Sequence, residues 1–168
     1  PRRSGSWTLR GASLSSDRHT LAWIGDGAPR MEVAHVELRH GELRAEGTQL
    51  GATYELRYRL WPTTLTVDLV GESSLKLDLA DADFFDLGWS PLFNSLPVLR
   101  DDLLTGGSAR AYEMRWVDVP SLRVERSEQR YEPLGGNIVR FAAGTFSAEI
   151  AFDDAGFVVD YPGLARRV

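Results

Sequence analysis

The sequence predicts an all-β fold in one domain, residues 1–168, with little helix. The main observation is that polar and apolar residues alternate with a period of two along most of the chain, as they do on strands with one buried face. Turn-forming residues separate these alternating runs. No stretch places apolar residues at i, i+3, i+4 and i+7 over three turns, although residues 100–109 could hold one short helical turn.

The individual strands follow from this alternation. Residues 33–39 and 42–47 alternate on either side of His40-Gly41, which predicts a hairpin. Residues 54–60 alternate most regularly, with Tyr and Leu on one face and Glu and Arg on the other. Further strands are expected at 65–70, 74–79, 111–119, 122–131, 137–141, 146–152 and 157–161. About ten short strands in one chain predict a sandwich, a barrel or a rolled sheet, because a flat sheet would leave long exposed edges.

Composition excludes several classes of protein. The net charge is −5 and the cationic residues are spread singly along the chain, so we expect no nucleic-acid partner. The chain has no cysteine and therefore no disulfide or thiolate site. No apolar run approaches the roughly 20 residues of a membrane-spanning helix, and residues 1–11 lack the apolar core of a signal peptide. A cytoplasmic location is expected, although residue 1 is not methionine and the chain can have been trimmed.

Sequence motifs for catalysis or metal binding are weak. There is no G-x-S-x-G elbow, P-loop or G-x-G-x-x-G fingerprint. His35 and His40 lie five residues apart in a hairpin and would point to opposite faces, so we read His35 as an ordinary sheet residue. The acidic run from Asp78 to Asp86 lacks the glycine and terminal glutamate of a calcium loop. We therefore expect no catalytic residue, no metal and no cofactor.

The segment 84–100, FFDLGWSPLFNSLPVLR, is the most informative part of the chain. It joins large apolar residues to two prolines with very little charge, within a gap in the strand pattern that covers residues 81–107. Connections of that length in a compact domain are uncommon and are often functional. Such an apolar segment either plugs the core or forms a binding surface.

The same segment resembles a known family. Asp86-Leu87 through Arg100 is similar to the signature D-L-x-x-[ST]-P-x-x-N-[ST]-L-P-x-x-R of the bacterial family called "putative glycolipid-binding". The tail GFVVDYPGLARR, residues 156–167, resembles that family as well. Two positions depart from its pattern: Leu99-Arg100 stands where consecutive arginines are frequent, and Ala165 stands where an aromatic residue is common. The resemblance implies a rolled, spiral, half-barrel-like antiparallel sheet and a role in binding a glycolipid.

Six residues are candidates for binding a lipid-like or glycolipid-like ligand. Trp89 and Phe93 could line an apolar groove for acyl chains. Polar groups at its mouth are expected from Asp86, Asn94, Arg100 and Tyr161. The alternative is structural, with Asp86 and Asn94 bonding to local backbone while the aromatic residues plug the core.

Two other functions stay open from the sequence. The chain could be a hydrolase or isomerase for a small amphipathic substrate, with Asp86 or His35 as base and Arg100 holding an anion. It could instead be a protein-interaction module or homodimer that buries the aromatic segment against a partner. The sequence leaves the oligomeric state open.

Overall fold

The computed structural model describes residues 16–168, so the expectation for residues 1–11 lies outside the described residues. The described chain forms one 13-stranded sheet with the strand order β6-β5-β4-β3-β2-β1-β13-β12-β11-β10-β9-β8-β7. The strands are β1 (Asp17–Gly25), β2 (Met31–Arg39), β3 (Glu42–Leu50), β4 (Glu55–Leu60), β5 (Thr64–Leu69), β6 (Ser73–Asp78), β7 (Phe84–Leu87), β8 (Arg110–Val117), β9 (Val124–Gly135), β10 (Ile138–Ala143), β11 (Phe146–Phe152), β12 (Val158–Tyr161) and β13 (Ala165–Arg167). This confirms the all-β rolled sheet.

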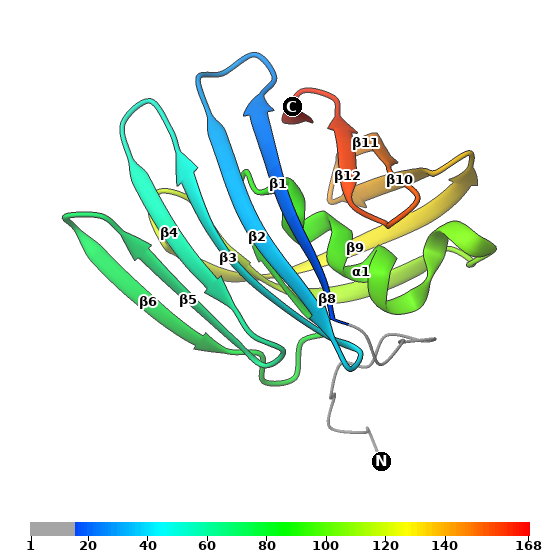
Figure 1. Ribbon diagram of the computed structural model, residues 1–168, viewed down its shortest axis with the longest axis horizontal. Helices are drawn as coiled ribbons and strands as arrows, with labels where there is room; N and C mark the ends of the chain where they lie inside the picture. Colours follow the sequence, from blue (N-terminus) through cyan, green and yellow to red (C-terminus); the bar gives the residue numbers. More distant parts are fainter. Residues whose placement is uncertain (1–15) are drawn as a thin grey trace.

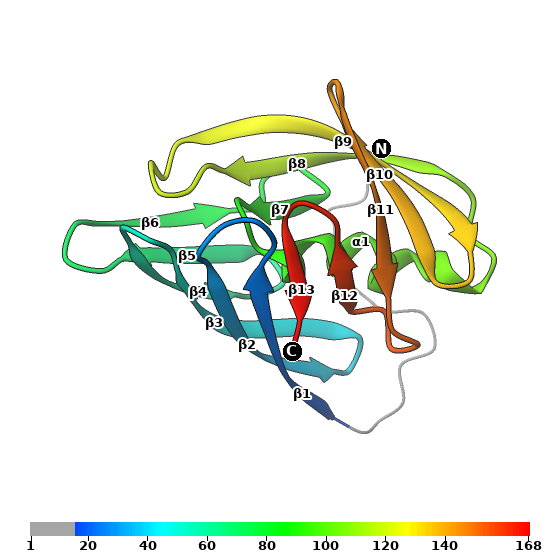
Figure 2. The ribbon, with the colours of Figure 1, turned by 90° about the horizontal axis from the view of Figure 1, so that it is seen from above.

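The sheet is open and curls around a helix. Strands β1–β6 form one wall and β8–β12 the other, with α1 (Pro91–Asp101) between the two walls (Figures 1 and 2). The central junction is made by β1 and β13, which pair from Trp23 with Arg167 to Gly25 with Ala165. Since β6 and β7 lie at the two ends of the strand order, the chain reaches one edge of the sheet and continues directly at the other.

The prediction of a loop over residues 84–100 was wrong. This segment contains strand β7 and all but the last residue of the 11-residue helix α1, which is followed by a short 3-10 helix at Leu103–Thr105. Strand β7 pairs in parallel with β8, and parallel strands need a long crossover that usually carries a helix. The gap in the strand pattern therefore contains the first strand and the crossover of a β-α-β unit.

The helix was not predicted from the sequence because almost none of its surface is exposed to solvent. All residues from Pro91 to Val98 are buried, so there is no polar stripe to reveal a period of 3.6 residues. Pro97 also lies inside the helix, where its missing N–H removes one intrahelical hydrogen bond. Pro91 occupies the first turn, where proline is well tolerated.

Three strands were also missed. Strand β7 is buried at three of its four residues and therefore does not alternate. Strand β13 has only three residues. In β1, the inward residues Leu21 and Trp23 are flanked by a mostly exposed beginning, so the alternation is short. The remaining ten strands coincide with the predicted runs apart from shifts at their ends.

The core fills the space between the two walls. Helix α1 supplies Leu92, Phe93 and Leu96 to it, all of them almost completely buried. One contact pins the helix to the second wall: the backbone N–H of Val158 on β12 donates to the hydroxyl of Ser95 at 3.1 Å. The carbonyl of the same Val158 accepts a hydrogen bond of 2.9 Å from the indole of Trp23. The helix is thus fixed as part of the core, where it can wall an internal site.

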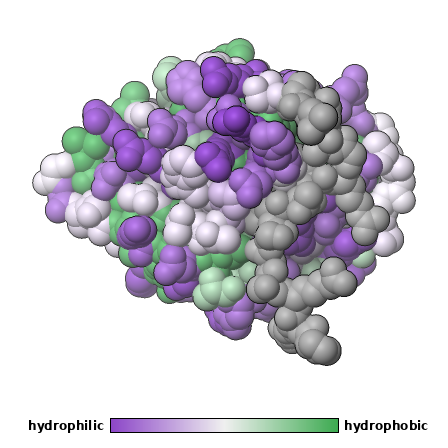
Figure 3. Space-filling model, turned by 60° about the horizontal axis from the view of Figure 1, so that its bottom comes forward, coloured by the Kyte–Doolittle hydropathy of each residue, from purple (hydrophilic) through white to green (hydrophobic). Residues whose placement is uncertain are grey.

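On the face that Figure 3 shows, hydrophilic residues predominate and hydrophobic ones lie in scattered patches. No helix in the described part of the chain is both long and apolar enough to cross a membrane.

Candidate functional site

The principal cavity lies between the start of α1 and the inner face of β7–β12. Its volume is about 610 Å³. Its apolar lining is Leu87, Trp89, Trp116, Phe141, Ala143, Phe146 and Leu164. Its uncharged polar lining includes Ser90, Asn94, Ser127, Gln129 and Tyr161, and its charged lining is Asp86, Asp118, Glu125 and Arg126. Four of the six candidate residues, Asp86, Trp89, Asn94 and Tyr161, line this one cavity.

Asp86 is the only charged residue of β7, and its side chain points to the cavity. Its Oδ2 accepts a hydrogen bond of 2.6 Å from the side-chain amide of Gln129 on β9. Burial raises the pKa of the Asp86 carboxyl to about 6, while the Gln129 bond and a backbone bond from Leu87 act in the opposite direction. The cavity therefore holds a carboxyl group that changes charge near neutral pH.

A chain of hydrogen bonds connects helix α1 to this carboxyl. Asn94 donates from Nδ2 to the hydroxyl of Tyr131 at 3.1 Å, and that hydroxyl donates to Oε1 of Gln129 at 3.3 Å. Gln129 then donates to Asp86. Because Asn94, Gln129 and Tyr131 are all buried, each would be costly to leave unpaired. The chain fixes the orientation of the polar end of the cavity.

Trp89 stands at the mouth of the cavity in an unusual backbone conformation. Its φ is 65°, in the left-handed region that bulky residues rarely adopt. Its ring is held by a hydrogen bond of 3.1 Å from Nε1 to the carbonyl of Val119 and by the guanidinium of Arg30, 4.1 Å from the ring centre. Even so, 44% of Trp89 remains exposed, so an apolar surface faces both solvent and cavity.

Aromatic residues of the second wall form the opposite side of the cavity. The ring of Phe141 lies 6.1 Å from those of both Phe146 and Tyr161, centre to centre. Phe146 is 52% exposed, whereas Tyr161 is buried and burial raises its pKa. The cavity thus passes from an exposed aromatic rim to a buried polar end.

The other two candidate residues lie elsewhere. Phe93 is buried against the first wall, where its ring meets that of Tyr58 edge-on at 5.4 Å. Arg100 is at the far end of α1, with its guanidinium 4.0 Å from the centre of the Phe84 ring and its Nε 3.3 Å from Asp101. Neither lines the cavity.

A buried carboxyl group behind the cavity was not predicted from the sequence. Glu32 on β2 is 2% exposed, and its Oε1 accepts hydrogen bonds of 2.7 Å from the hydroxyls of both Ser90 and Tyr58. Burial raises its pKa to about 7, and its Oε2 is buried without a hydrogen-bond partner. The alternation Glu32, Ala34, Val36 could have revealed it, but the predicted strand began at Val33 and left Glu32 out.

Glycine makes room for the tyrosine of this cluster. Gly47 on β3 is paired with Tyr58 on β4, and a Cβ at Gly47 would lie 2.3 Å from ring atoms of Tyr58. The ring can therefore cross β3 to reach Glu32 on β2. Gln49 continues the polar set toward the cavity, since it donates to the carbonyl of Gly88 at 3.2 Å.

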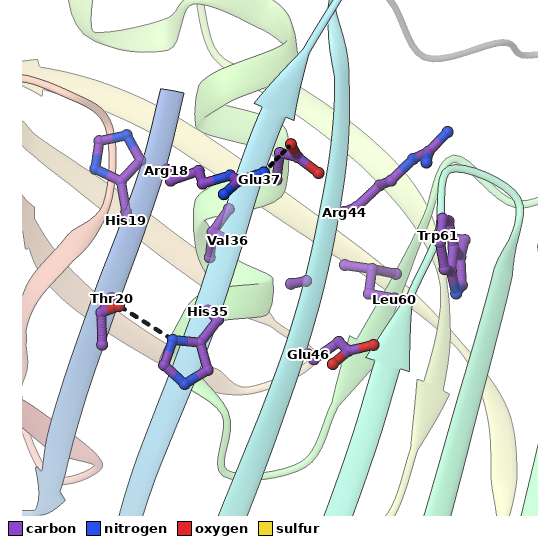
Figure 4. Close-up of a pocket in the computed structure, with 11 residues that line it drawn as sticks. Arg18, His19, Thr20, His35, Val36, Glu37, Arg44, Glu46, Leu60 and Trp61 are labelled. Atoms are coloured by element: carbon purple, nitrogen blue, oxygen red, sulfur yellow. Dashed lines mark hydrogen bonds and ion pairs between the residues drawn. The ribbon is translucent and has the colours of Figure 1, made fainter. Parts of the chain in front are cut away.

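A smaller hollow of about 310 Å³ lies over the ends of β1–β4 (Figure 4). Here His35 and Thr20 share a hydrogen bond of 3.0 Å, and Arg18 contacts Glu37 at 3.4 Å. The guanidinium of Arg44 lies 4.6 Å from the centre of the Trp61 ring. These groups pair with one another on an exposed surface, so they form a weaker candidate site than the principal cavity.

The residues of the hydrolase or isomerase hypothesis do not share one site. Asp86 lines the principal cavity, His35 lines the smaller hollow and Arg100 lines neither. Within residues 16–168 no group of three or more His, Asp and Glu side chains is arranged to hold a metal ion.

The described chain thus combines a rolled sheet, a helix in its core and a cavity that is apolar at the rim and polar inside. The model of the family described as "Putative glycolipid-binding" matches residues 69–167. The chain belongs to this family, as its signature segment indicated.

A solved structure shows the same fold. The crystal structure of a DUF1089 family protein from Pseudomonas aeruginosa is similar with a TM-score of 0.53 and 21% sequence identity, over 99% of this chain and 95% of that one. No curated protein shows a significant match to the chain.

Proposed function

We propose that this protein binds a lipid-like or glycolipid-like molecule in the cavity between α1 and strands β7–β12. The observation that carries the proposal is the cavity itself, which joins an exposed aromatic rim to a buried polar end. Its volume of about 610 Å³ falls within the range of roughly 300–1,000 Å³ that is usual for small-molecule sites. The description of the family as glycolipid-binding names the same class of ligand as this proposal.

The apolar part of the ligand would enter along Trp89 and Phe146. Both side chains are about half exposed and both line the cavity, so a hydrocarbon chain there would remove apolar surface from water. Burial of apolar area contributes about 25 cal/mol per Å². Aromatic faces of this kind can also stack on sugar rings.

The polar part would meet Asp86, Asn94 and Tyr161. The hydrogen-bond chain from Asn94 to Asp86 holds these two residues in place before any ligand arrives. A site organised in advance loses less conformational entropy on binding. This arrangement supports recognition of hydroxyl groups.

Binding is tested with the uncharged fluorescent probe N-phenyl-1-naphthylamine and a variant that fills the cavity. Ser127 lines the cavity, so Ser127→Phe places a ring in the proposed site. Ser74→Phe on the exposed edge strand β6 is the matched control. We expect the wild type and Ser74→Phe to bind the probe and Ser127→Phe to bind it at least about tenfold more weakly.

Native mass spectrometry and organic extraction of the purified protein would identify a ligand that stays bound. If the wild type takes up no probe and carries no extractable lipid, the proposed function is wrong. Equal binding by all three proteins would place the probe outside this cavity and would also contradict it.

A further inference from the structure

The distribution of charge around the cavity supports an inference that rests on the proposed function and makes it more specific. We propose that Asp86 selects ligands by the charge of the head group, so that the cavity accepts uncharged, hydroxyl-bearing head groups and disfavours anionic ones. Glycolipids as a class include molecules with uncharged head groups and molecules with anionic head groups.

The charged part of the cavity lining is mostly acidic. Three carboxylates, Asp86, Asp118 and Glu125, face one guanidinium, that of Arg126, among the described residues that line it. Arg126 forms an ion pair with Asp81, and its side chain is 63% exposed, so it is both occupied and hydrated. An anionic head group would therefore meet a lining of net negative charge whose one guanidinium is already paired.

Asp86 lies at the polar end of the cavity, partly exposed and next to the buried side chain of Gln129. Gln129 on β9 donates to the Asp86 carboxylate, whose charge helps to raise the pKa values of Tyr131 on β9 and Tyr161 on β12. Two unit charges about 8 Å apart at an effective dielectric of about 20 repel by about 2 kcal/mol, which is roughly 30-fold in affinity. A nearby anion therefore loses affinity while Asp86 is ionised.

The same carboxylate is well suited to a sugar. An ionised carboxylate can accept about four hydrogen bonds. Gln129 and the backbone N–H of Leu87 supply two of them. The remaining capacity can accept hydroxyl donors from an uncharged head group. Attraction of hydroxyls and repulsion of anions thus come from one residue.

The test compares two amphiphiles with the same hydrocarbon chain, octyl β-D-glucoside and octyl sulfate, below their micelle-forming concentrations. The readout is the ratio of their affinities, measured by isothermal titration calorimetry at pH 7.5. We expect the wild type to favour the glucoside by about tenfold or more. Asp86→Asn removes the charge with little change of shape, and its amide carbonyl can still accept the Gln129 bond, so we expect the ratio to fall to within about threefold of unity.

Asp160→Asn is the matched control, since Asp160 lies on β12 beside Tyr161 but is exposed. This substitution removes the same formal charge from outside the cavity, so the ratio of the two affinities should stay at its wild-type value. If Asp160→Asn changes the ratio as much as Asp86→Asn does, net charge and not Asp86 sets the preference, and the proposal is overturned.

A second measurement needs no substitution at Asp86. Octyl sulfate stays ionised between pH 7.5 and 5, whereas Asp86 takes up a proton near pH 6. We expect the wild-type preference for the glucoside to weaken as the pH falls through 6. Glu32 also titrates in this range and contacts the cavity residue Ser90. The pH dependence should therefore persist in Glu32→Gln and disappear in Asp86→Asn.

The outcomes separate the two proposals. If both amphiphiles bind with similar affinity at every pH, the charge selection is wrong and the binding function stands. A preference for octyl sulfate would likewise overturn it. If neither amphiphile nor the naphthylamine probe binds, both proposals fail.

Discussion

The hydroxyl of Ser90, the residue that precedes helix α1, donates a hydrogen bond of 2.7 Å to Oε1 of Glu32 on β2. This contact joins the first wall of the roll to the start of the helix that lines the cavity. Tyr58 donates to the same oxygen at 2.7 Å, while Oε2 of Glu32 is buried and unpaired. Because burial raises the pKa of Glu32, the stability of this cluster depends on the protonation of that residue.

Stability should fall as Glu32 ionises. Its pKa is raised from 4.5 to about 7 in the folded protein, so the folded state binds the proton more tightly than the unfolded state. The stabilisation is fully present below about pH 4.5 and is lost as the pH rises through about 7. In urea unfolding at pH 5 and pH 8, Glu32→Gln should gain up to about 3 kcal/mol relative to wild type over this range.

Glu37→Gln is the control for this experiment, because Glu37 lies on the same strand in a partly exposed ion pair with Arg18. It should follow the wild-type pH dependence. Parallel curves for wild type and Glu32→Gln would show that Glu32 does not titrate as its burial implies.

Gly47 should be essential to the position of Tyr58. Gly47→Ala would bring a methyl group within 2.3 Å of the Tyr58 ring. We expect a loss of about 1–3 kcal/mol in the free energy of unfolding, as for other overpacked sites. In a Tyr58→Leu background, where the distal ring atoms are gone, the same change should cost clearly less. Additive effects in this double-mutant cycle would contradict the proposed steric role.

Ser95 should stabilise the contact between helix and sheet. Ser95→Ala leaves the buried N–H of Val158 without its partner, which should cost about 1–3 kcal/mol. The same change at the exposed Ser73 of β6 should fall within about 0.5 kcal/mol of wild type. Unfolding in urea measures both variants. A neutral effect at Ser95 would mean that Val158 finds another acceptor.

Trp89 should report ligand binding, and Trp61 should not. Both tryptophans are about two-fifths exposed and each lies against an arginine, but only Trp89 lines the principal cavity. Trp89→Phe should weaken binding of octyl glucoside roughly 2- to 10-fold and reduce the change in tryptophan fluorescence. Trp61→Phe should leave affinity unchanged. If Trp61→Phe weakens binding instead, the ligand occupies the smaller hollow of Figure 4.

Much of the candidate site could be found from the sequence because its residues lie close together in the chain. Asp86, Trp89 and Asn94 fall within nine residues, and the tail segment supplied Tyr161. What could not be found were the partners from distant strands. Gln129 is one of many polar residues in an alternating strand, and only its 2.6 Å contact with Asp86 distinguishes it.

The sequence by itself determined ten of the 13 strands in the described chain, because alternation is a local property that each of these segments carries without its neighbours. Only the tertiary structure showed that segment 84–100 forms a strand and a helix. Residues 91–98 of the helix are all buried, so no polar face marks the helix in the sequence. The tertiary structure also decided that Phe93 and Arg100 point away from the cavity while Glu32 lies behind it. Which side chains meet depends on how the two walls close around α1, and that closure is set by packing between residues far apart in the chain.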